Sequence, residues 1–130
     1  MKTVTMHGGM WGRNLANINL IPSSKEPGGQ GVYILYDGSM PVYVGKGNMR
    51  SRIKSARLGK RRGQLWDHFS WYSLNPQITH DIEALILRML PLYLRSLTKQ
   101  KGKFLAARKV KELPENRTAE FISRKVKRNA

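Results

Sequence analysis

The segment from Gly31 to Ile53 constrains the fold most, because it has the pattern of a β-hairpin followed by a basic helix. Two runs rich in β-branched and aromatic residues flank Asp37-Gly38, a dipeptide that supplies the positive φ of a tight turn. A three-residue loop would place Tyr33 and Tyr43 opposite each other on one face, since side chains alternate along both strands. The other face is then expected to carry Val32, Ile34, Val42 and Val44. Facing phenols also occur in purely structural sheets, so a structural and a functional interpretation both stay open here.

The rest of the chain predicts a small α+β domain. Residues 67–74 are aromatic and β-prone, which indicates a third strand. Apolar residues recur at helical spacing over 48–58 and 76–96, so helices are expected there. The expected fold is therefore a three-stranded, mainly antiparallel sheet (31–36, 42–45 and 67–74) flanked by helices. The 130-residue length fits one domain.

Strong positive charge points to a polyanionic partner. The formal net charge is +16, and nucleic acid is the leading candidate. An anionic membrane surface is the weaker one, because the basic segments lack a strong aromatic apolar face. Eight Lys or Arg residues and no acid lie between Lys46 and Gly63, a run that could be a solvated face or a face that follows phosphates. The residues predicted to contact nucleic acid are Lys46, Arg50, Lys54, Arg57, Lys60, Arg61, Arg62, Lys99, Lys101 and Lys103.

Glu83 is a carboxylate inside an otherwise apolar helical stretch. A buried carboxylate must be paired or bound to a cation, or its pKa must rise. Spacing alone slightly favours a salt bridge with Arg52 or Arg88. His68, in the third strand, could assist a base or orient a phosphate, although a lone strand histidine is more often simply hydrogen-bonded.

Three motifs carry a resemblance to a known family: Gly31-Val32-Tyr33, then Tyr43-Val44-Gly45-Lys46, then Arg52-Ile53. This pattern resembles the core of the GIY-YIG endonucleases, in which the two tripeptides lie on adjacent antiparallel strands before a helix with an arginine. The resemblance covers about residues 31–104.

The resemblance implies a metal-dependent DNA endonuclease that leaves a 5′-phosphate and a 3′-hydroxyl. Tyr33 would orient or deprotonate the attacking water, with Tyr43 and Lys46 shaping its hydrogen bonds. The pKa of an ordinary tyrosine is about 10, so a nearby cation has to help the phenol act as a base at neutral pH. Arg52 would stabilise the phosphoryl charge, and Glu83 would bind Mg²⁺, with Mn²⁺ as an alternative.

Two positions depart from the family pattern. Ala56 stands where many members have a histidine one turn after the arginine, which draws attention to His68 as a substitute. Thr98 stands where many have an asparagine. These departures keep an alternative open, a non-catalytic nucleic-acid-binding module of the same fold. A basic ribosome-associated protein that prefers RNA is a third hypothesis.

The termini add an irregular arm at 1–30, packed on the domain, and a basic helical extension at 105–130. The chain has no cysteine, which excludes disulfides and cysteine-based sites. With neither a signal-like nor a membrane-spanning run, a cytoplasmic location is expected. The expected partner is double-stranded DNA, with RNA still open, bound by a monomer or weak dimer. The chain has little spare length for reading sequence, so targeting by a partner protein is one route to specificity.

Overall fold

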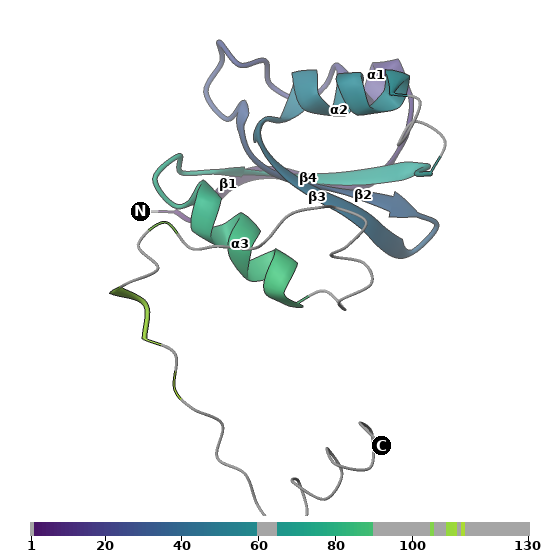
Figure 1. The fold of residues 1–130 in the computed structure, drawn as a ribbon. Coiled ribbons are helices and arrows are strands. Elements are labelled where there is room, and N and C mark those ends of the chain that lie inside the picture. The colour runs from purple at the N-terminus through teal and green to yellow at the C-terminus, as the bar shows by residue number, and fades with distance from the viewer. Residues whose placement is uncertain (1, 60–64, 90–104, 106–108, 112, 114–130) are drawn as a thin grey trace, which may run out of the picture.

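The computed structural model describes residues 2–59, 65–89, 105, 109–111 and 113. These residues form three layers, with one four-stranded antiparallel sheet between helices on its two faces (Figure 1). Helices α1 (Leu15–Ile18) and α2 (Met49–Leu58) cover one face, and α3 (Thr79–Met89) covers the other. The coarse prediction of a small α+β domain is confirmed.

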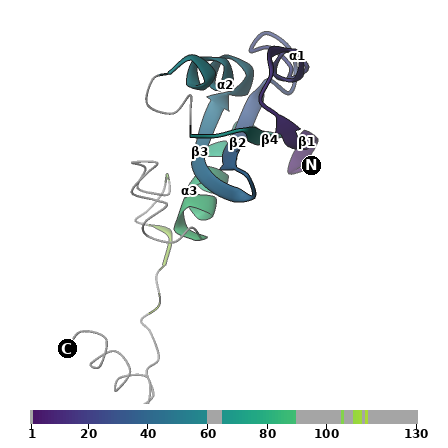
Figure 2. The same ribbon diagram turned by 90° about the vertical axis from the view of Figure 1, so that its right-hand side faces the viewer.

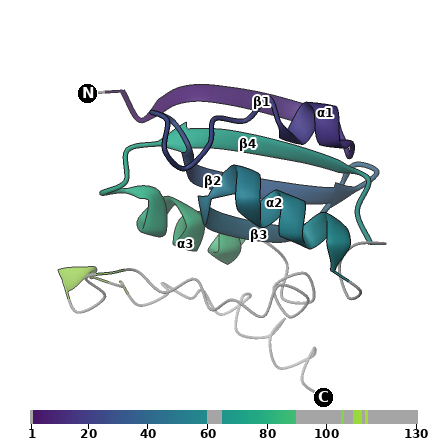
Figure 3. The same ribbon diagram turned by 90° about the horizontal axis from the view of Figure 1, so that it is seen from above.

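The sheet has four strands, so the prediction of three was wrong. Its order is β1 (Val4–Gly12), β4 (His68–Leu74), β2 (Gln30–Asp37) and β3 (Met40–Asn48), as Figure 3 shows from above. The additional strand, β1, comes from the arm that was expected to be irregular. It pairs with β4 along nearly its whole length, with two register shifts. As a result, β2 and β4 are central, whereas β1 and β3 are the edge strands.

The hairpin between β2 and β3 forms where it was predicted, but in a different register. Asp37 pairs with Met40, which leaves a two-residue turn instead of a three-residue loop, and a bulge follows on β3. Tyr33 therefore lies opposite Gly45 and not opposite Tyr43. The net shift is two residues, so the two tyrosines still share a face, as the period of a strand requires. The bulge also turns Val42 toward the face that carries Tyr33.

The α2 face of the sheet holds the larger hydrophobic cluster. Met49 and Ile53 of α2 are fully buried against strand residues such as Leu35 and Phe69. Figure 2 shows α2 lying along this face. Asn48 precedes the helix as expected, but its side chain makes no capping bond; it accepts a hydrogen bond from Gln30 instead (2.9 Å). The helix ends at Leu58, and the chain leaves it through Gly59.

The α3 face holds a second cluster, in which Leu87 packs on Val32 and Val44. The helix begins at Thr79 and not at Pro76, because 76–78 form turns. Asn75 supports this start, since its side chain accepts from the Gln77 N–H (3.0 Å) and its carbonyl accepts from the Thr79 hydroxyl (3.0 Å). Within the part of the chain that the structure describes, no helix has the length and apolar character needed to cross a membrane.

Several predictions lie outside the described residues. These are residues 90–96 of the predicted 76–96 helix, Thr98, most of the C-terminal extension, and the basic residues Lys60, Arg61, Arg62, Lys99, Lys101 and Lys103.

Candidate active site

The glycine stretch of β3, Gly45 to Gly47, is the point at which the predicted site residues meet. The phenol of Tyr33 lies over Gly45, so close that a Cβ atom added there would be 2.3 Å from Tyr33 Oη. The rings of Tyr33 and Tyr43 lie 6.0 Å apart and are tilted by 37°, a favourable separation for an aromatic pair. Tyr33 is 3% exposed, whereas Tyr43 is half-buried. Tyr43 is therefore the more accessible phenol.

Arg52 of α2 reaches the other end of the glycine stretch. A Cβ atom added to Gly47 would lie 2.9 Å from Arg52 Nε, so the guanidinium rests against the bare backbone there. Gly47 also has a φ of 106°, which side-chain-bearing residues rarely adopt. The glycine thus makes room for the arginine and permits the turn into α2. Arg52 itself is exposed, so its donors remain open to a ligand.

Lys46, between these glycines, faces α3. Its Nζ hydrogen-bonds to Nδ1 of His80. Lys46 pairs across the sheet with the buried Val32, whose side chain packs in the α3 cluster. The lysine and His80 therefore approach each other over the α3 face.

Glu83 of α3 completes the group. It is only 5% exposed. Burial raises the pKa of its carboxyl, while Lys46, His80 and Arg52 act in the opposite direction. A buried carboxyl group in this setting is stabilised either by protonation or by a cation that lies beside it.

The position of β3 at the sheet edge explains how residues from both faces can meet. Arg52 comes from the helix on one face and Glu83 from the helix on the other, yet Arg52 still lowers the pKa of the Glu83 carboxyl, although less than Lys46 and His80 do. In the interior of a sheet, the strands themselves would separate such groups. Among the described residues no strand lies beyond β3, and α2 and α3 lie on the two faces that adjoin it (Figure 2).

A metal ion at this edge would need water or substrate oxygens as ligands in addition to protein side chains. Among the described residues, no three His, Asp or Glu side chains are grouped to hold an ion. Glu83 offers one carboxylate beside Lys46 and Arg52. This donor set fits Mg²⁺, which is often bound by one or two carboxylates together with water and substrate phosphate.

His68 is not brought to this group. It lies opposite Tyr36, at the far end of β4 from Tyr72, and so about 13 Å along the strand from the row that contains Lys46. Its Nδ1 is 2.9 Å from Asp67 Oδ1. The hydrogen bonds from the His68 ring and from the Gly38 N–H lower the pKa of Asp67. The predicted help of His68 to a catalytic base therefore has no support in this geometry.

The basic residues of α2 do not form one uniformly solvated face. Arg50 donates from Nη2 to the carbonyl of Asn19, which ties the helix to the segment after α1. Lys54 and Arg57 are half-buried. Arg52 is the exposed basic residue of the four on this helix.

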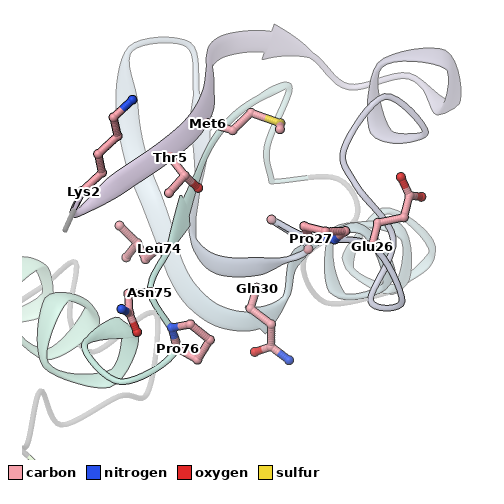
Figure 4. Close-up of a pocket in the computed structure, with 11 residues that line it drawn as sticks. Lys2, Thr5, Met6, Glu26, Pro27, Gln30, Leu74, Asn75 and Pro76 are labelled. Atoms are coloured by element: carbon pink, nitrogen blue, oxygen red, sulfur yellow. The ribbon is translucent and has the colours of Figure 1, made fainter.

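A separate hollow of about 650 Å³ lies between β1, the loop before β2 and the segment that joins β4 to α3 (Figure 4). Its lining includes Met6, Pro27, Gln30, Leu74 and Pro76. None of the predicted catalytic residues borders it. The predicted chemistry and this hollow are thus at different places on the molecule.

His80 is the site residue that the sequence analysis missed. It precedes Glu83 by three positions, a spacing that puts two helical residues on neighbouring parts of one face. That spacing was the available signal. The partner of His80, Lys46, is 34 positions away, and no local pattern connects them.

Comparison with known proteins adds no relative: no family model, curated protein or solved structure matches this chain.

Proposed function

We propose that this protein is a Mg²⁺-dependent endonuclease that hydrolyses phosphodiester bonds of DNA and leaves a 5′-phosphate and a 3′-hydroxyl. The observation that carries the proposal is that Arg52 rests against Gly47, while the buried Glu83, on the helix of the opposite face, lies within electrostatic reach of Lys46, His80 and Arg52. Phosphoryl transfer depends mainly on positioned charges of this kind. The net charge of +16 supports a polyanionic substrate.

Each residue of the group has a distinct task in this proposal. Arg52 donates hydrogen bonds to the phosphate as its oxygens gain charge. Tyr43 and Tyr33 orient the attacking water, with Tyr43 offering the more accessible hydroxyl. Lys46 supplies a positive charge on the α3 side of the glycine stretch, where its Nζ contacts His80.

Glu83 is the residue that would hold Mg²⁺, and waters and phosphate oxygens would fill the other positions. When bound, the ion would stabilise the charge that develops on the leaving oxygen. Lys46 and Arg52 disfavour a free cation at this place by charge repulsion. The binding of metal and of substrate phosphate is therefore expected to be mutually dependent.

The test is cleavage of supercoiled plasmid by the purified protein. It compares the wild-type protein with Mg²⁺, the wild-type protein with EDTA, and the Glu83→Ala variant with Mg²⁺. Nicked or linear product from the wild-type protein with Mg²⁺ alone is the expected result. A single site predicts nicks before linear product.

The alternative is a module of the same fold that binds nucleic acid without cutting it. The observation in its favour is the group of positive side chains around Glu83, which a purely structural carboxylate would also attract. Plasmid that stays intact, yet is retarded in a gel by both proteins, would replace the nuclease with this alternative.

A further inference from the structure

The contact between Lys46 Nζ and His80 Nδ1 joins the edge strand β3 to helix α3. An ammonium group has only donors, so the nitrogen that it meets has to accept. A histidine that accepts at Nδ1 is neutral and carries its proton on Nε2. With the lysine charged, the contact therefore assigns the acceptor role to Nδ1 and the ring proton to Nε2.

From this contact we infer that His80 is a positioning residue for the proposed reaction: it holds the Lys46 ammonium in place beside the glycine stretch. The inference rests on the proposed function for its catalytic consequence, but the contact itself can be tested separately. A lysine side chain is long and has many rotamers, so an acceptor at its tip reduces its freedom.

The same geometry argues against His80 as a second metal ligand. Nδ1 is engaged by Lys46, and Nε2 carries the proton, so neither nitrogen has a lone pair to offer. His80 and Glu83, three positions apart on α3, consequently have different tasks. One holds the lysine, and the other offers the carboxylate.

Two substitutions of His80 separate a positioning role from a merely structural one. The side-chain oxygen of Asn occupies about the place of Nδ1, whereas that of Gln reaches about as far as Nε2. His80→Asn should keep the acceptor for Lys46 and retain kcat within about threefold. His80→Ala and His80→Gln should lower kcat about tenfold or more, with little change in KM. His7→Ala is the matched control, because His7 is exposed and lies on β1, the edge strand farthest from β3.

Nitrogen NMR of the three histidines tests the contact without any activity, at pH about 8, where imidazole is ordinarily neutral and lysine charged. The His80 ring should show its proton on Nε2. Lys46→Met should shift the His80 Nδ1 signal and leave those of His7 and His68 in place. A proton on Nδ1, or an Nδ1 signal that ignores Lys46→Met, would overturn the inference.

The two proposals fail differently. If wild-type protein cuts DNA and His80→Ala cuts equally well, the positioning role is wrong and the nuclease stands. If neither the wild-type protein nor any variant cuts DNA, the proposed nuclease function is wrong, and the NMR result still decides whether His80 holds Lys46.

Discussion

The ring of Tyr33 occupies the space that a side chain at Gly45 would need: a Cβ atom there would lie 2.3 Å from both Cζ and Oη of the tyrosine. The two residues are direct cross-strand partners in the central pair of the hairpin. Tyr33 belongs to the buried cluster under α2, so it has little room to move aside.

Gly45→Ala should therefore displace the Tyr33 ring and lower the free energy of unfolding by about 1–3 kcal/mol, the usual range for overpacking. Urea denaturation measures this loss, and plasmid cleavage should fall with it. Gly9→Ala is the control, since a Cβ atom at Gly9 has no neighbour within 4 Å. Equal stability of the two variants would show that the tyrosine ring can yield without cost.

Arg52→Ala should abolish most activity while leaving the fold intact. The side chain is exposed, so its removal costs little packing, whereas loss of a transition-state charge contact typically lowers the rate at least ~10²-fold. Rates of plasmid nicking and thermal melting, measured on the same preparation, separate the two effects. Ser55→Ala, exposed on the same helix, should behave like the wild type. Near-full nicking by Arg52→Ala would remove Arg52 from the mechanism.

Glu83→Gln should stabilise the protein at neutral and alkaline pH. Because burial raises the folded-state pKa of Glu83, the folded chain binds more protons than the unfolded chain between the two pKa values. The free energy of unfolding of the wild type therefore falls as the pH rises through that window. Glutamine resembles the protonated acid and avoids this loss, so its advantage in Tm should be largest above the window and vanish below about pH 4, beneath the ordinary Glu value.

Melting curves in EDTA across this pH range are the measurement. A difference of 1 kcal/mol would shift Tm by roughly 2–8 °C in a domain of this size. Asp81→Asn, an exposed acid on the same helix, should show no such pH-dependent gain. A Glu83→Gln protein that is less stable at pH 8 would mean that the carboxylate is held by a favourable charge pair.

Arg50 and Lys54, four positions apart on α2, should give opposite results when each is replaced by alanine. Arg50 donates to the Asn19 carbonyl, so Arg50→Ala should cost about 1 kcal/mol of stability. Lys54→Ala should change stability by less than about 0.5 kcal/mol, but it should reduce the slope of log affinity against log salt by about 0.9 if Lys54 meets a phosphate. Denaturation and DNA affinity at several salt concentrations measure the two quantities. An equal loss of salt slope in both variants would assign Arg50 to the DNA surface as well.

Local patterns in the sequence predicted much of the fold. The hairpin, α2 and β4 were found close to their predicted places because each has a periodicity or turn signal of its own. The hairpin register was wrong by two residues because the two-residue turn and the bulge each shift the pairing by one, and neither has a reliable local signal. The error kept Tyr33 and Tyr43 on one face, since a shift of two preserves the alternation of side chains.

Strand β1 was missed for a different reason. It contains glycines at 8, 9 and 12 and is mostly exposed, so neither propensity nor alternation identifies it. Strand β1 is stabilised by pairing with β4, which lies far from it in the sequence, and by the edge-to-face contact of Trp11 with Trp71. Tertiary contacts of this kind are absent from any local window.

The predicted site residues were brought together only in part. Tyr33 and Lys46 lie in the hairpin, and Arg52 lies in the helix directly after it. Their proximity therefore depends on short-range structure. Glu83 reaches them because α3 crosses the opposite face. His80 and the carbonyl partner of Arg50 depend on contacts between distant segments, which the chain's own order does not reveal.

The strand order has a consequence for synthesis. The first strand to leave the ribosome, β1, pairs with the last, β4, and the bond between Thr5 and Ser73 spans 68 positions. The hairpin of β2 and β3 can form as soon as it emerges, because its contacts are local. Until β4 follows, Trp11 has no Phe69 or Trp71 to pack against. The nascent segment that contains Trp11 therefore stays uncovered until β4 emerges, and chaperones can bind it during that interval.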